Sequence, residues 1–245
     1  MDKLVFQSMT GAKALAQRQE ALANNLANAN TTGFRADLAT FRAVPVRAEG
    51  TATTRVYALE ATSGFDPSGG PVMQTGRNLD VALRGPGFLA VQGTDGNEAY
   101  TRAGAFEVSA EGTLVTRAGL PVLSDGGPIQ LQPNAEVSIG DDGTVSARVP
   151  GQAPIQAGRL KLVNPDPAAL QKGADGLLRT RDGQPADADP AVRVAQGALE
   201  GSNVNVVESM VGMIALARQF EMQMKMMQNA EQNAQKAQSL LSMNG

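Results

Sequence analysis

Residues 206–241, VVESMVGMIALARQFEMQMKMMQNAEQNAQKAQSLL, contain no proline and carry an apolar or small residue at every seventh position. The repeated column is Val206, Met213, Phe220, Met227, Ala234 and Leu241, and a second column is Met210, Ala217 and Met224. Two such columns are typical of a helix that packs along a coiled-coil seam. Asn205 and Glu208 have the spacing of a capping box, so we predict a helix from about 205 to 242.

The other end of the chain predicts a matching helix. Residues 2–30 lack proline, have one early glycine, Gly11, and are rich in Ala, Gln and Leu, which favour helix. Leu15, Leu22 and Leu26 fall on one side of it. Asn28, Asn30 and Gly33 predict its end, because Asn and Gly tolerate the left-handed conformation of a C-cap. A lone helix is marginal in water, so the two terminal helices are the natural partners of each other.

The apolar surface of the C-terminal stretch is wider than one partner helix covers. Ile214, Leu216, Met222 and Met226 lie off the predicted seam. We therefore infer that the chain ends are loose in the monomer and become fully ordered in an assembly. The side chains predicted to form the assembly interface are Leu15, Leu22, Leu26, Val206, Met210, Met213, Ala217, Phe220, Met224, Met227 and Leu241.

The middle of the chain has a different pattern, in which Gly, Pro and Asp-Gly turns punctuate short alternating runs. The predicted strands are Leu79–Leu83, Phe88–Val91, Ala105–Ser109, Thr113–Thr116, Glu136–Ile139, Thr144–Val149, Ile155–Val163 and Val192–Ala195, with a short helix at Pro167–Gln171. The predicted fold is mainly β with long terminal helices. A discontinuous coiled-coil domain, residues 1–34 and 203–245, flanks an all-β domain, residues 77–195, and residues 35–76 form an extended linking segment.

Composition argues against most kinds of enzyme. The sequence has no histidine, cysteine or tryptophan, which removes histidine bases, thiolate nucleophiles and the commonest metal ligands. We predict no catalytic, cofactor-binding or metal-binding residue. The net charge of −3 provides no basic surface for nucleic acid, and no apolar run is long enough to span a bilayer. The N-terminus lacks the apolar run of a cleavable signal peptide.

Three stretches could suggest a ligand site, but each has a simpler interpretation. Asp141-Asp142-Gly143 lacks the oxygen ladder of an EF-hand and predicts a hairpin turn. Gly85-Pro86-Gly87 lacks the third glycine of a dinucleotide fingerprint. The methionines of 222–227 could suggest a soft copper site, but helical spacing explains them as packing surface.

Three separated motifs, in order along the chain, carry a resemblance to a known family. They are Leu22–Phe34 (LANNLANANTTGF), the core motifs Gly76–Asp80, Gly85–Phe88 and Tyr100–Phe106, and Gly201–Asn205 (GSNVN) followed by Glu208. Together they resemble the rod and hook proteins of the bacterial flagellum. The residues that match the terminal motifs are Asn24, Asn25, Leu26, Asn28, Gly33 and Phe34 at the first end and Asn203, Asn205 and Glu208 at the second.

The resemblance implies a structural role. Such proteins are exported by the flagellar type III apparatus and stack helically, with themselves and with other rod proteins, into the shaft that crosses the periplasm and transmits torque. Met1–Leu4 and Phe41–Val46 favour the proximal-rod member, with the distal-rod member as the alternative. The asparagines of both motifs would act as helix caps or as hydrogen bonds between subunits. Outside the family, a binding module on a coiled-coil stalk and a carboxylate-based hydrolase remain alternatives.

Overall fold

The computed structural model of the protein describes residues 2–45, 56–132, 135–149, 151 and 153–242, without the side chains of residues 2–8, 40–45, 56–63, 234 and 237–242. The chain forms two compact units. The helical unit contains residues 1–27, 37–64 and 205–245, and the β unit contains residues 28–36 and 65–204. Neither helix in the described ranges combines the length and the apolarity that a membrane crossing requires.

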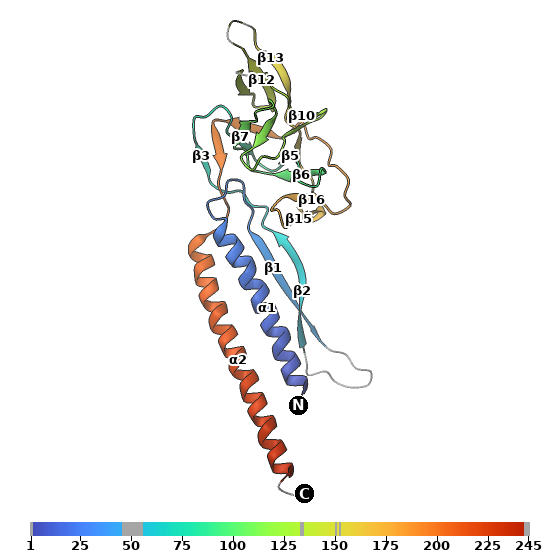
Figure 1. Ribbon diagram of the computed structural model, residues 1–245, viewed down its shortest axis with the longest axis vertical. Helices are drawn as coiled ribbons and strands as arrows, with labels where there is room; N and C mark the ends of the chain where they lie inside the picture. The colour runs from blue at the N-terminus through green and yellow to red at the C-terminus, as the bar shows by residue number, and fades with distance from the viewer. Residues whose placement is uncertain (1, 46–55, 133–134, 150, 152, 243–245) are drawn as a thin grey trace. The chain divides into compact units, whose positions relative to one another are not determined.

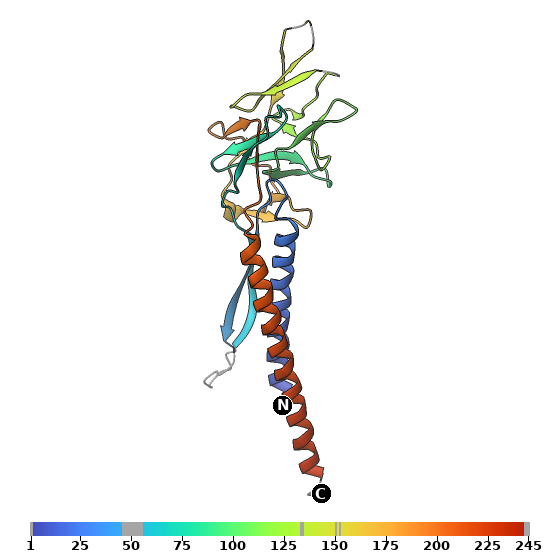
Figure 2. The ribbon, with the colours of Figure 1, turned by 90° about the vertical axis from the view of Figure 1, so that its left-hand side faces the viewer.

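The helical unit is built on two long helices, as the sequence predicts. Helix α1 (Asp2–Ala27) and helix α2 (Val206–Ser242) lie side by side and run in opposite directions (Figures 1 and 2). Asn205 caps α2, because its side-chain Oδ1 accepts a hydrogen bond from the Glu208 amide at 3.2 Å. The predicted cap is therefore confirmed.

The helical unit also contains a two-stranded sheet, β1 (Asp37–Pro45) and β2 (Val56–Phe65), next to α1 (Figure 1). We interpreted residues 35–76 as an extended linking segment, and here the structure differs. Strand β1 packs on α1, so most of this segment belongs to the helical unit. A segment rich in Thr, Ala, Gly and Pro does not by itself predict strands, because here each strand is stabilised by pairing with the other.

The β unit is a set of small antiparallel sheets joined by tight turns (Figure 2). The largest sheet has five strands in the order β14-β5-β6-β16-β15, and a three-stranded sheet has the order β11-β12-β13. The strands are β3 (Val72–Gln74), β4 (Val81–Arg84), β5 (Phe88–Gln92), β6 (Glu98–Thr101), β7 (Phe106–Val108), β8 (Leu114–Thr116), β9 (Leu123–Ser124), β10 (Gly127–Pro128), β11 (Glu136–Ile139), β12 (Thr144–Arg148), β13 (Ile155–Arg159), β14 (Leu162–Val163), β15 (Leu170–Lys172), β16 (Leu178–Thr180), β17 (Arg193–Gln196) and β18 (Ala198–Glu200).

The inward side chains of these strands form the core of the β unit. The main cluster includes Val81, Leu89, Phe106, Leu114 and Val145, all of which are almost fully buried. A second cluster gathers around Phe88, Tyr100 and Leu170 from the five-stranded sheet. Alternation is clean in β11 and β12, where every second residue is buried.

Each predicted strand overlaps an observed one, and the predicted strand 155–163 is divided into β13 and β14. The turn expected at Asp141-Asp142-Gly143 is present, with Gly143 at φ 84° and Asp142 accepting a hydrogen bond from the Thr144 amide. The short helix expected at Pro167–Gln171 is a single 3₁₀ turn, Pro167–Ala169, because Leu170 already pairs with Thr180 in the sheet.

Candidate assembly surface

Two glycines mark where α1 and α2 approach each other closely. A Cβ added to Gly11 in α1 would lie 3.0 Å from the Gln223 Nε2 atom of α2. A Cβ added to Gly212 in α2 would lie 3.0 Å from the Leu22 Cδ1 atom of α1. The two pairs together define an antiparallel register, in which each step forward along α1 meets a step backward along α2.

The buried side of α2 differs from the predicted seam in one of its two columns. The central column is as predicted, with Met213 and Met227 half-buried and Phe220 at its edge. The second column is Ser209, Leu216 and Gln223, where we predicted Met210, Ala217 and Met224. Leu216, which we placed off the seam, is only 6% exposed.

Small residues explain why α1 lies on this side of α2. Ser209 and Gly212 leave room for the helix backbones to approach, and Leu22 fills the space over Gly212. Both candidate columns flank the central one at spacings of three or four residues, so the periodicity of the sequence does not distinguish them. The sequence favours the column of Met210, Ala217 and Met224 because methionine is more apolar than serine or glutamine, whereas the column that faces α1 is Ser209, Leu216 and Gln223.

Large apolar side chains of α2 remain exposed away from the seam. Val207, Val211 and Ile214 lie on its outer side, and Val207 is 72% exposed. Met210, Ala217 and Met224 are exposed along one flank. Met222 lies three turns beyond Val211 on the outer side, and Met226 is exposed next to it towards the other flank. Val206 is also partly exposed, and the side chain of Leu241 lies outside the described residues. An apolar helix surface that continues around three sides is typical of an interaction surface.

Two asparagines of the first motif join the end of α1 to β1. Asn25 is buried, and its side chain accepts a hydrogen bond from the Asp37 amide at 2.7 Å and donates one to the Asp37 carbonyl at 3.0 Å. Asn24 donates to the Asp37 carboxylate. Asn25 thus pairs with the first residue of β1 as a neighbouring strand would. Of the predicted α1 residues, Leu15, Leu22 and Leu26 are half-buried.

In the β unit, residues adjacent to the two terminal motifs meet at a buried carboxylate, Glu200, for which the sequence predicts no role. Glu200 is 2% exposed, and its Oε1 atom accepts hydrogen bonds from Arg35 at 2.6 Å and from the Gly70 amide at 2.9 Å. Its Oε2 atom accepts one from Arg102 Nε at 2.7 Å. Arg102 also donates to the carbonyls of Gly85 and Gly87. We call Arg35, Arg102 and Glu200 the arginine–glutamate cluster.

The cluster keeps Glu200 ionised. Burial raises the pKa of its carboxyl, but the hydrogen bonds from Arg35 and Gly70 and the charges of the two arginines outweigh burial, so the pKa lies below its ordinary value. A buried carboxylate with two arginines therefore joins segments that are far apart in the sequence.

Motif residues next to the cluster complete the connection between segments. Asn203 accepts a hydrogen bond from the Ala36 amide at 2.8 Å and donates to the carbonyls of Asp66 and Ser68. Gly33 has φ 69°, and a Cβ there would lie 2.2 Å from the carbonyl carbon of Arg102. Residues 28–36 and 203–204 consequently belong to the β unit, although we predicted a terminal-helix domain that ended at 34 and resumed at 203.

Phe34, the last residue of the first motif, is held by a cation. Lys172 Nζ lies 3.8 Å from the centre of its ring and donates a hydrogen bond to the Arg35 carbonyl at 2.8 Å. Asn28 accepts a hydrogen bond from the Thr31 hydroxyl after the end of α1. The motif residues Asn25, Asn28, Asn203 and Asn205 thus all make hydrogen bonds within the chain.

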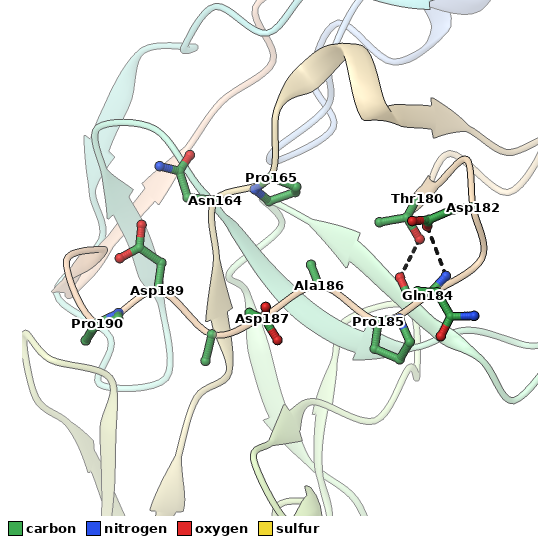
Figure 3. A pocket seen from close by; sticks show the side chains of 11 residues that line it. Asn164, Pro165, Thr180, Asp182, Gln184, Pro185, Ala186, Asp187, Asp189 and Pro190 are labelled. Atoms are coloured by element: carbon green, nitrogen blue, oxygen red, sulfur yellow. Dashed lines mark hydrogen bonds between the residues drawn. The ribbon is translucent and has the colours of Figure 1, made fainter.

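The β unit also has an open depression of about 460 Å³ (Figure 3). It is lined by Asp182 and residues 184–190, together with Asn164, Pro165 and Thr180. Two of its carboxylates stabilise turns. Asp182 accepts a hydrogen bond from the Gln184 amide, and Asp189 accepts one from the Ala191 amide. Thr180 donates its hydroxyl to the Gln184 carbonyl. Over the described residues, no group of three or more acidic side chains is placed to hold a metal ion.

Comparison with known proteins agrees with this geometry. Residues 8–35 match the family described as "Flagella basal body rod protein", residues 82–147 match "Flagellar hook protein FlgE/F/G D1 domain", and residues 195–240 match "Flagellar basal body rod FlgEFG protein C-terminal". The first and last matches contain the two sequence motifs.

Full-length relatives give the same result. The chain is 46% identical to the flagellar basal-body rod protein FlgF of Escherichia coli K12, over 99% of this chain and 100% of the relative. It is 44% identical to FlgF of Salmonella typhimurium, with the same coverage. A FlgG protein of Buchnera aphidicola from Schizaphis graminum is 36% identical over 95% of this chain and 97% of the relative. The chain therefore belongs to the flagellar basal-body rod protein family and is FlgF-like.

Proposed function

We propose that this protein is a structural subunit of the proximal rod, which assembles through its terminal helices into the torque-transmitting shaft of the flagellum. Its partners are further copies of itself and other rod proteins, and it reaches the periplasm through the flagellar type III export apparatus. It has no enzymatic role and needs no cofactor. Higher identity to the FlgF relatives than to the FlgG relative above favours the proximal over the distal rod.

The observation that carries the proposal is the exposed apolar surface of α2. The helix has one partner helix in the chain, yet Val207, Val211 and Ile214 face away from it and are more than half exposed. Burying such a side chain contributes on the order of 1–2 kcal/mol when about half of it is covered. Neighbouring helices in a rod would cover this surface on several sides, and coiled-coil packing with them is part of the proposal.

The alternative of a binding module on a helical stalk predicts a different distribution of apolar surface. A two-helix stalk needs one seam, whereas α2 exposes apolar side chains on its outer side and on both flanks. The depression in Figure 3 is open, and two of its three aspartates, Asp182 and Asp189, accept hydrogen bonds from turn amides. Both features favour the structural role.

A single substitution tests the proposal without disturbing the seam. Ile214→Asp changes a side chain that is 57% exposed, so the isolated chain should keep its helices and its β unit. We expect it to be absent from basal bodies isolated from a strain that lacks its own copy and to abolish swimming. Gln232→Asp is the control, because it introduces the same residue on the same side of α2 at an exposed position beyond the exposed apolar side chains. Normal incorporation of Ile214→Asp would refute the proposal.

A further inference from the structure

We propose that four exposed methionines of α2, Met210, Met222, Met224 and Met226, form an oxidation site at which peroxide converts an assembly-competent chain into an incompetent one. The inference rests on the proposed function, since it concerns the same surface. The new element is that oxidation of this surface by peroxide would block assembly.

Exposure separates these methionines from their neighbours. Met222 and Met226 are 57% and 58% exposed, Met210 is 49% exposed, and Met224 is the least exposed of the four at 37%. Met213 and Met227, one turn or less away, face α1 and are half-buried. The sequence contains no cysteine, so thioethers are its only sulfur groups. Peroxide therefore meets no thiol on this chain that would react first.

The four side chains extend from one flank of the helix across its outer side. Met210 and Met224 are fourteen residues apart, which places them at nearly the same angle around α2. Met222 and Met226 are one turn apart, from the outer side towards the other flank. Oxidation at either pair places a polar group where a neighbouring helix would pack.

The chemistry requires only the oxidant. Hydrogen peroxide transfers one oxygen atom to the thioether sulfur, which becomes a sulfoxide, and the peroxide is reduced to water. The sulfur loses two electrons, and no bond of the chain breaks. The product is larger, polar and a strong hydrogen-bond acceptor, and it no longer packs as an apolar side chain.

The first test follows oxidation of the purified full-length chain. Hydrogen peroxide is added, and peptide mass spectrometry measures sulfoxide at each methionine with time. We expect Met210, Met222 and Met226 to react several-fold faster than Met213 and Met227, at rates similar to that of Met73, which is 53% exposed on β3. Met224, at 37% exposed, should react at an intermediate rate. Equal rates at Met213 and Met227 would overturn the proposal, because the site would have no selectivity.

The second test asks whether the change in polarity stops assembly. A variant with all four methionines changed to Leu keeps the apolar surface, and a variant with all four changed to Gln mimics the sulfoxide. In the strain that lacks its own copy, we expect the Leu variant to enter basal bodies as the native chain does and the Gln variant to be at least ten-fold depleted. Met73→Gln is the matched control outside the helical unit and should have no effect.

The outcomes distinguish this inference from the proposed function. If the Gln variant assembles while Ile214→Asp does not, the oxidation site is refuted and the structural role stands. If both assemble, both proposals fail. If the Leu variant is as depleted as the Gln variant, assembly depends on the shape of methionine rather than on polarity, and the oxidation site is refuted.

Discussion

Removing the charge of Glu200 should destabilise the β unit strongly. Glu200→Gln keeps the size of the side chain but leaves Arg35 and Arg102, which are 3% and 6% exposed, without a carboxylate. The two ion-pair contacts are 2.6 Å and 2.7 Å long. Loss of one partner from a buried ion pair costs about 3–5 kcal/mol, because an uncompensated charge stays in the interior. We expect a loss of this size in the free energy of unfolding.

Hydrogen exchange is the suitable assay, because the chain has two units and one thermal transition would not report on each. Amides of β5 and β6 lie in the central strands of the five-stranded sheet and exchange through large openings of the β unit. A loss of 3–5 kcal/mol accelerates their exchange by about two to three and a half powers of ten. Peptides from α2 should change little.

The pH dependence gives a second readout. The pKa of Glu200 is lowered in the folded chain, so the stabilisation is fully present above the ordinary value of 4.5 and is lost as the pH falls through the folded-state value. The urea midpoint of the β unit should fall in this acid range, and this part of the fall should be absent from Glu200→Gln. Glu107→Gln, an exposed replacement on β7, is the control. Exchange of the β5 and β6 amides in Glu200→Gln within three-fold of the native rate would show that the ionised Glu200 does not stabilise the β unit.

Three further changes have defined outcomes. Gly33→Ala should lower the free energy of unfolding by well over 1 kcal/mol, because a Cβ would lie 2.2 Å from the Arg102 backbone. Gly76 has a similar φ of 71° but no atom within 4 Å of an added Cβ, so Gly76→Ala should cost about 1 kcal/mol. Urea unfolding measures both variants. Leu216→Ala should lower the free energy of unfolding of the helical unit by about 2–5 kcal/mol, because Leu216 is buried. Ile214→Ala should lower it by only about 0.5 kcal/mol, because Ile214 is exposed, and exchange of α2 amides measures both. Burial raises the pKa of Tyr100 to about 12, so in a Tyr57→Phe background tyrosinate absorbance should titrate near that value, and stability should fall between about pH 10 and 12.

Local features were predictable from the sequence. The cap at Asn205, the absence of proline and the Leu and Met spacing are contained within single segments, so both helices follow from them. Strand β11 is predictable because its alternation is local. The family motifs also locate residues that the structure uses, such as Asn25 and Asn203, although not their partners.

Features that depend on distant partners were not predictable. Strand β6 pairs with both β5 and β16, and β16 lies far along the chain. Glu200 is separated by 165 residues from Arg35 and by 98 from Arg102, and no spacing rule connects them. One signal was present, because Glu200 is a charged residue in a short strand directly before the second motif. Both candidate columns of α2 fit the heptad repeat, so the sequence does not show that Leu216 is buried, and only the position of α1 does.

In the assembled rod, neighbouring subunits are proposed to cover the outer side of α2. Because the sequence has no cysteine, Ile214→Cys introduces a unique thiol at a position that is 57% exposed in the isolated chain. The most direct measurement is the rate at which a maleimide labels this thiol in the purified chain and in isolated basal bodies. We expect rapid labelling of the free chain and at least ten-fold slower labelling in basal bodies. Equal rates in the two samples would contradict it.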